Sequence, residues 1–198
     1  MDGINLTDPD AVFMKNGRII THSYNVETTV DGNGYIVGVD VVNKADDFGE
    51  GVRQLEQVKE TLQLESLSGV THAADGGFGS VDLLRYYEEN NIDGLVPQKM
   101  FNRGRYSLST YAYEEGRDVF IAPDDTTIYI KKSVHKLPNG IVQHIYIPDA
   151  WKKELRKMVV VEETFFLRER MRRKVEQNRE KYKKRAKPKF TYGEQYTI

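Results

Sequence analysis

The sequence predicts an α/β protein in which a mixed sheet carries flanking helices, followed by a β-rich insertion and a basic C-terminal helix. Three observations lead to this prediction. A hairpin signal, DGNG at 31–34, separates two stretches rich in β-branched residues. Apolar residues of 50–64 then recur every three or four positions, which is typical of an amphipathic helix. A short strand, a helix and another short strand follow within 70–96.

The N-terminal part is expected to form a turn-rich start and a β-hairpin. Residues 1–18 contain an Asp-Pro and an Asn-Gly dipeptide, both of which break regular structure. Residues 19–30 alternate partly between apolar and polar types, as strands do. Residues 35–42 form an almost continuous apolar run, interrupted by Asp40, which fits a central strand covered on both faces.

Two helices and two short strands follow. Residues 50–64 form the first helix, and residues 70–74 form a short buried strand that runs into a glycine turn. Residues 80–91 form the second helix, for which Ser80 is a suitable N-cap. Residues 92–96 give the last short strand of this part.

The rest of the chain is expected to be β-rich and then helical. Residues 118–147 are predicted as two or three strands, and residues 150–187 as one long basic helical pattern. The predicted divisions are a core (1–99), a β-rich insertion (100–149) and a basic helical segment (150–198).

The net charge of −1 is the sum of two opposite parts. Residues 1–150 hold 13 basic and 23 acidic residues, a charge of −10, whereas residues 151–198 hold 16 basic and 7 acidic residues, a charge of +9. A basic arm on an acidic body is typical of proteins whose arm contacts phosphates. The alternative is a solvated helix whose long side chains cover apolar surface.

The composition excludes several classes of protein. There is no cysteine, which excludes a disulfide framework and thiolate metal sites. There is also no run of about 18 apolar residues that would span a membrane. The N-terminus is acidic and has no apolar core, unlike a signal peptide. We therefore expect a cytoplasmic protein without a membrane partner.

Asp75 is the residue that the sequence singles out for chemistry. It lies where a buried strand ends and a glycine turn begins, and sites in α/β sheets form at the carboxyl ends of strands. A carboxylate there can bind Mg²⁺ together with waters and substrate phosphates. The alternative interpretation is an aspartate that only caps a turn. Three residues earlier, His72 is either a neighbour of such a metal or a histidine of the core.

Two groups of basic residues are candidates for DNA contact. Arg103 and Arg105 stand close to Tyr106 and Tyr111 in the sequence, a combination that can bind phosphates and stack on bases, or that packs a loop on the sheet. A denser cluster near the C-terminus would release counterions on binding DNA. Its members are Lys183, Lys184, Arg185, Lys187 and Lys189.

Several stretches together resemble the DDE transposases of bacterial and archaeal insertion sequences. The matching stretches are TDPDAVFMKNGR (7–18), SYNVETTVDGNGYIVGVDVV (23–42), the Asp pair at 46–47, ADGGFGSVDLLRYYEENNIDGLVPQK (74–99) and, less closely, RERMRRKVEQNREKYKKRAK (168–187). The resemblance implies an RNase H-like fold, in which three carboxylates bind two Mg²⁺ or Mn²⁺ ions for DNA strand cleavage and transfer. Asp75 falls on the second of these carboxylates. Residues 1–99 would be the partial catalytic core.

The chain departs from the family's pattern at the other two carboxylates. The first Asp belongs to a strand before the segment matched by residues 7–18, and we expect this strand to be missing and the fold to be incomplete. Asp40 is the best spare acid, although it falls on the third strand of that fold. The third acid is a glutamate, for which Glu194 is the nearest candidate but is out of register. Glu176 is expected to face solvent.

These departures decide the expected activity. One carboxylate does not hold two Mg²⁺ ions, because hard cations need several oxygen ligands. We therefore expect a truncated or split transposase with little activity by itself, whose partners are DNA and other transposase subunits or the missing N-terminal part. The alternative is a non-catalytic RNase H-like module that binds DNA or protein, or the product of a decayed gene.

Overall fold

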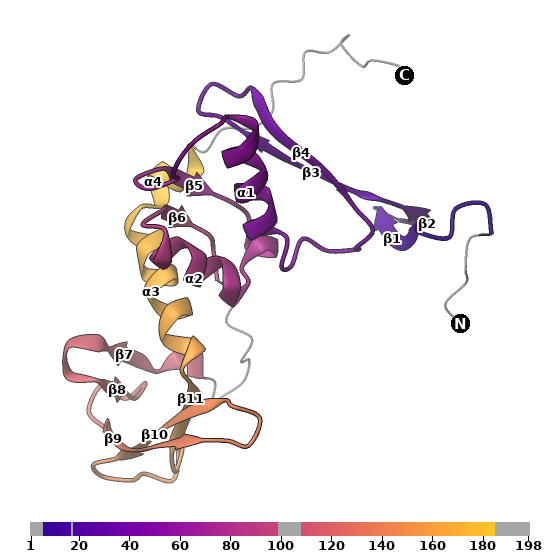
Figure 1. Cartoon of the computed structure of the whole chain (residues 1–198). Helices are drawn as coiled ribbons and strands as arrows, with labels where there is room; N and C mark the ends of the chain where they lie inside the picture. The colour runs from indigo at the N-terminus through magenta and orange to yellow at the C-terminus, as the bar shows by residue number, and fades with distance from the viewer. Residues whose placement is uncertain (1–5, 17, 99–107, 185–198) are drawn as a thin grey trace. The chain divides into compact units, whose positions relative to one another are not determined.

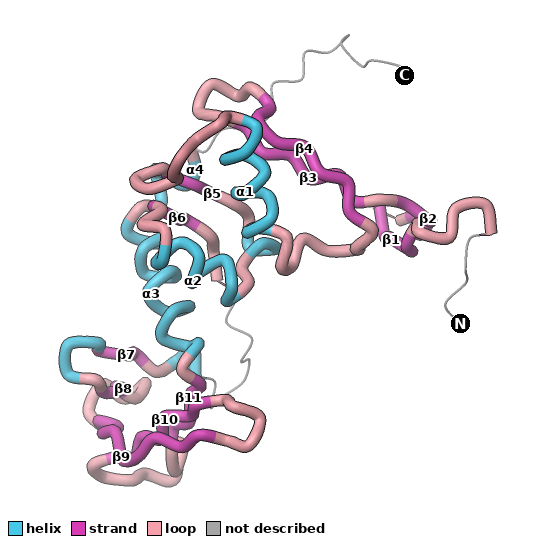
Figure 2. The backbone as a smooth tube through the Cα atoms, in the orientation of Figure 1, coloured by secondary structure: helices cyan, strands magenta, loops and turns pink. Residues whose placement is uncertain are grey.

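The computed structural model describes residues 6–16, 18–98 and 108–184 (Figure 1). It is a mixed α/β structure, and Figure 2 shows how helices and strands follow one another along the chain. The chain divides into two compact units. The first unit comprises Met1–Pro97 and Met171–Ile198, and the second comprises Gln98–Arg170. No helix in the described ranges is both long enough and apolar enough to cross a membrane.

The first unit contains three two-stranded sheets, of which β1–β2 and β3–β4 are antiparallel and β5–β6 is parallel. Its strands are β1 (Val12–Asn16), β2 (Ile19–Ser23), β3 (Asn25–Val30), β4 (Ile36–Val42), β5 (Thr71–Ala73) and β6 (Asp93–Leu95). Its helices are α1 (Gly51–Thr61), the 3₁₀ helix η1 (Gly76–Phe78), α2 (Val81–Glu89), the last turns of α3 (Thr164–Gln177) and α4 (Arg179–Lys183).

The predicted turn joins β3 to β4. Asp31 Oδ1 accepts hydrogen bonds of 2.9 Å from the main-chain N–H groups of Asn33 and Tyr35. Gly34 has a φ of +89°, a left-handed conformation that glycine adopts without a steric penalty. The predicted hairpin turn is therefore confirmed. The central strand expected over 35–42 is not, because within the described residues β4 pairs only with β3, and its Val39 and Val41 are exposed.

Helix α1 covers one face of the β3–β4 hairpin. Its Leu55 and Val58 are buried, and Val58 Cγ2 lies 3.2 Å from the point where a Cβ on Gly38 would stand. Thr29, which pairs with Gly38 across the hairpin, donates a 3.0 Å hydrogen bond to Gln54 of α1. The opposite face of the hairpin carries exposed apolar side chains, namely Val26, Val39 and Val41.

Helix α2 connects the parallel strands β5 and β6. The predicted N-cap is confirmed, because Ser80 Oγ accepts a 3.2 Å hydrogen bond from the main-chain N–H of Leu83. Leu83, Leu84 and Tyr87 are buried. Burial of this apolar face, rather than helix propensity, stabilises such a short helix.

Asp93, at the start of β6, ties the C-terminal helices to the parallel strands. Lys174 Nζ of α3 lies 2.8 Å from one carboxylate oxygen, and Lys181 Nζ of α4 lies 2.6 Å from the other. Hydrogen bonds from Lys174 and Lys181 hold the pKa of Asp93 far below its usual range. Part of the basic segment is therefore paired with the acidic body.

The second unit is a five-stranded antiparallel sheet in the order β11-β10-β9-β8-β7. Its strands are β7 (Ala112–Glu114), β8 (Val119–Ile121), β9 (Ile128–Lys136), β10 (Val142–Pro148) and β11 (Val159–Glu162), and it also contains the 3₁₀ helices η2 (Leu108–Thr110) and η3 (Glu115–Arg117). Phe120, Tyr129 and Tyr146 are fully buried in its core. The prediction of two or three strands over 118–147 is confirmed by β8, β9 and β10.

Strand β11 contradicts part of the predicted helix 150–187. Val159 and Val161 are buried whereas Val160 and Glu162 are exposed, an alternation typical of a strand. This strand pairs with β10, so pairing with a distant segment determines its conformation. The helix begins only at Thr164.

The N-terminal prediction also needs correction. The expected turn-rich start contains β1, because Val12–Asn16 pairs along its whole length with β2 in an antiparallel hairpin. The predicted strand 19–30 is divided at Tyr24 into β2 and β3. The expected continuous mixed sheet is divided as well, since the hairpin β3–β4 and the pair β5–β6 are separate sheets within the described residues.

Candidate functional site

Asp75 stands two residues after the end of β5, at the N-terminus of η1. The strand is not buried as expected, since Thr71 is exposed and His72 and Ala73 are half-buried. Its Oδ1 accepts a 2.7 Å hydrogen bond from the main-chain N–H of Gly77. The predicted position between strand and glycine turn is therefore confirmed. The capping interpretation also holds, but the cap uses one of the two carboxylate oxygens.

A second carboxylate lies beside Asp75. The point where a Cβ on Gly77 would stand is 2.8 Å from Asp75 Oδ1 and 2.9 Å from Asp47 Oδ2. Only glycine fits between the two carboxylates at this position. Asp47 belongs to the loop after β4, and its Oδ1 accepts a 2.7 Å hydrogen bond from Asn25 Nδ2 of β3. Sequence reasoning did not assign a role to Asp47, although the Asp pair at 46–47 after a strand was a signal for it.

Glu27 adds a buried acid to this end of the hairpin. It is 4% exposed, and Gln54 Nε2 donates a 3.1 Å hydrogen bond to its Oε2. Burial, followed by the charges of Asp47, Glu50 and Asp40, raises the pKa of Glu27 to about 7. Glu27 and Asp47 are therefore two acids close enough for the charge of one to affect the other.

The variant Glu27→Gln is expected to change the pH dependence of stability. Because the folded-state pKa lies above the ordinary 4.5, Glu27 destabilises the fold progressively as pH rises from 4.5 through 7. The full effect is on the order of 3 kcal/mol. The difference in unfolding free energy between the variant and the wild type, measured by urea titration, should therefore increase in favour of the variant from pH 4.5 to pH 8.

A matched control is Glu60→Gln, which removes a carboxylate from the exposed surface of α1 and leaves the buried site unchanged. Comparison between variants is needed because burial lowers the pKa of His72 to about 4, an effect of opposite sign in an overlapping range. A pH-independent difference for Glu27→Gln would contradict the assignment of the raised pKa.

His72 is half-buried and bonded within the fold. Its Nδ1 lies 2.7 Å from the hydroxyl of Tyr87, and the two rings are 5.8 Å apart. This contact supports the interpretation as a satisfied core histidine over that of a metal neighbour. Asp40, the spare acid of the sequence prediction, lies 2.8 Å from the guanidinium of Arg53 on α1.

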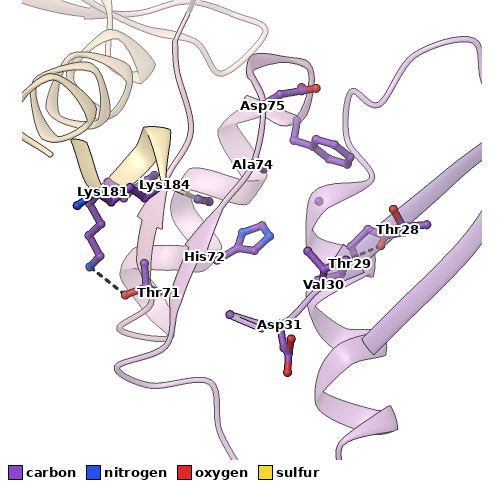
Figure 3. Close-up of a pocket in the computed structure, with 16 residues that line it drawn as sticks. Thr28, Thr29, Val30, Asp31, Thr71, His72, Ala74, Asp75, Lys181 and Lys184 are labelled. Carbon is purple, nitrogen blue, oxygen red and sulfur yellow. Dashed lines mark hydrogen bonds between the residues drawn. The ribbon is translucent and has the colours of Figure 1, made fainter. Parts of the chain in front are cut away.

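A groove of about 540 Å³ lies between β3 and β5 within the first unit (Figure 3). Residues 28–32 line one side, and residues 71–75 line the other. Asp75 lies at one end of the β5 side, and Thr71 lies at the opposite end beside Lys181 and Lys184. We call this feature the β3–β5 groove.

The remaining predicted residues are distributed as follows. Lys183 lies on α4, 2.8 Å from Glu180, and Lys184 lines the β3–β5 groove. Tyr111 is buried in the second unit, so it packs rather than stacks on bases. Glu176 is exposed as expected and pairs with Arg172. Outside the described residues lie Arg103, Arg105, Tyr106, Arg185, Lys187, Lys189 and Glu194.

The described ranges contain no group of three or more histidine or carboxylate side chains arranged to hold a metal ion. Asp75 and Asp47 form a pair. No family model, curated protein or solved structure matches the chain.

Proposed function

We propose that the first unit is an RNase H-like core of a DDE transposase, a protein that cleaves and transfers DNA strands with Mg²⁺ or Mn²⁺. The observation that carries this proposal is the pairing of Asp75 and Asp47 at the carboxyl end of β5. The proposal is also supported by the order of elements along the chain. The hairpin β3–β4 comes first, then helix α1, strand β5, helix α2 and strand β6.

The donor atoms at this site fit one hard cation. Mg²⁺ in phosphoryl-transfer sites is commonly held by one or two carboxylates, together with waters and substrate phosphates. Asp75 and Asp47 supply two such carboxylates. A bound ion would polarise a phosphate group and lower the pKa of a bound water. Asn25, by its hydrogen bond, orients Asp47 for this role.

A second ion needs further carboxylates from outside the described residues. Glu194 is the candidate that the sequence offers for the third acid. Without the complete set, the chain by itself would bind a cation and DNA but would cut DNA slowly or not at all. Lys183 and Lys184 would contact DNA phosphates, joined by Arg103, Arg105, Arg185, Lys187 and Lys189.

The test measures Mn²⁺ binding to the chain. The electron paramagnetic resonance signal of the free ion gives the amount that is not bound. Asp75→Asn keeps an oxygen that accepts from Gly77 N–H but removes the charge, and Asp47→Asn likewise keeps an acceptor for Asn25. Each variant should weaken Mn²⁺ binding by about tenfold or more, equivalent to about 1.4 kcal/mol.

The matched control is Asp82→Asn, an exposed acid in the first turn of α2, which should bind Mn²⁺ like the wild type. Equal binding by the wild type and Asp75→Asn would refute the metal site. A strand-cleavage assay with Mn²⁺ tests completeness, since rapid cutting that Asp75→Ala abolishes would show that the chain needs no further carboxylates.

A second candidate function is a non-catalytic module that binds another protein. The observation that favours it is the β3–β5 groove, which lies between two strand edges. Intact Mn²⁺ binding by Asp75→Asn together with binding of a partner in the groove would support this alternative.

A further inference from the structure

Two strand edges of the first unit face the β3–β5 groove. Within the described residues, β3 pairs only with β4, and β5 pairs only with β6. The groove between them is lined by both strands (Figure 3). An unpaired edge presents a row of main-chain N–H and C=O groups, which is a template for another strand.

The main-chain groups of β5 that face the groove can be identified. Ala74 N–H donates to Leu95 of β6, and Val70 C=O accepts from Asp93 of β6. Because main-chain groups of successive residues in a strand point to opposite sides, those of Thr71 and Ala73 point away from β6. β5 therefore offers the groove two N–H and two C=O groups.

The two edges run in opposite directions. Asp47 accepts a hydrogen bond from Asn25, the first residue of β3, and lies beside Asp75, two residues after the end of β5. The start of β3 and the end of β5 are thus at the same end of the groove. A single strand between them would be antiparallel to one neighbour and parallel to the other, and both arrangements form regular ladders.

We propose that the β3–β5 groove binds one extended segment of a second polypeptide as an added β-strand. The added strand joins the two-stranded sheets into one five-stranded mixed sheet in the order β4-β3-added strand-β5-β6. Two-stranded sheets are marginally stable in water, whereas a sheet of three or more strands packed on helices is stable. Strand addition is an established mode of peptide recognition in which main-chain hydrogen bonds supply the affinity.

The lining defines the chemistry of the added strand. Alternate residues on its helix side meet Gln54 and His72, which favours small or hydrogen-bonding side chains. Residues on the opposite side extend the apolar stripe of Val26, Val39 and Val41, which favours valine or isoleucine. Lys184 and Asp31 both line the groove at the Thr71 end, so a neutral polar residue at that end can hydrogen-bond to either.

The test is a displayed library of random nonapeptides, selected on the full chain without metal or DNA. Enriched peptides should carry apolar residues at every second position. A synthetic copy of the best peptide should slow amide hydrogen exchange in β3 and β5 by roughly tenfold or more and leave the second unit unchanged. The same peptide with N-methyl groups on alternate amides should not bind, because it cannot form the ladders.

Several outcomes would overturn this proposal. They are a lack of enrichment, protection confined to other strands, or unchanged binding of the N-methylated peptide. A peptide-free dimer with protected β3 and β5 would show that a second copy of the chain is the occupant. Because no readout uses metal or DNA, failure of Mn²⁺ binding with intact peptide binding would refute only the proposed function.

Discussion

Replacing Phe120 by alanine is expected to destabilise the second unit by about 3–5 kcal/mol, the usual cost of emptying a buried aromatic site. Phe120 has no exposed surface and stands at the centre of an aromatic cluster. Its ring centroid lies 4.9 Å from that of Tyr146, 5.0 Å from that of Tyr113 and 5.5 Å from that of Phe165. Truncation removes all three contacts and leaves a cavity. Urea unfolding followed by tyrosine fluorescence measures the loss.

A matched truncation is Val134→Ala on β9, where the side chain is 52% exposed. Its effect should stay within about 0.5 kcal/mol, as expected for surface substitutions. If Phe120→Ala were as stable as Val134→Ala, the aromatic cluster would not be the core of this sheet.

Replacing Gly94 by alanine is expected to disrupt the parallel strands beneath the candidate site. A Cβ at this position would stand 2.2 Å from Tyr87 Cδ2 and 2.3 Å from Cε2, far inside van der Waals contact. Tyr87 cannot move away easily, because it is 3% exposed and its hydroxyl bonds to His72. We expect a loss of about 1–3 kcal/mol or more from overpacking.

The specific readout for Gly94→Ala is the titration of His72 by NMR. Displacement of Tyr87 should expose the imidazole and move its pKa from about 4 toward the ordinary 6.5. Gly116→Ala is the control, since nothing lies within 4 Å of a Cβ there. An unchanged His72 pKa and unchanged unfolding midpoint in Gly94→Ala would contradict the close packing of Tyr87 on β6.

Short-range patterns allowed several elements to be predicted from the sequence. The turn at 31–34 follows from an aspartate that accepts main-chain hydrogen bonds and from a glycine with positive φ. Helix α2 follows from its N-cap Ser80 and its apolar period. These features depend on neighbours a few residues apart, so a single sequence contains the physical information that determines them.

Elements that depend on distant partners were predicted less well. The segment 159–162 lies within a basic stretch of helical character, and only pairing with β10 makes it a strand. The expected continuous sheet is divided by the β3–β5 groove, which no local pattern indicates.

The sequence by itself determined that Asp75 follows a short strand and precedes a glycine turn, because strand, turn and cap are set by adjacent residues. Only the tertiary structure decided which acid lies beside Asp75. Asp47 is 28 positions away in the sequence, and its approach depends on Asn25 and on the space that Gly77 leaves. The groove likewise lies between β3 and β5, strands of two separate sheets, and no local pattern predicts it because these strands are far apart in the sequence.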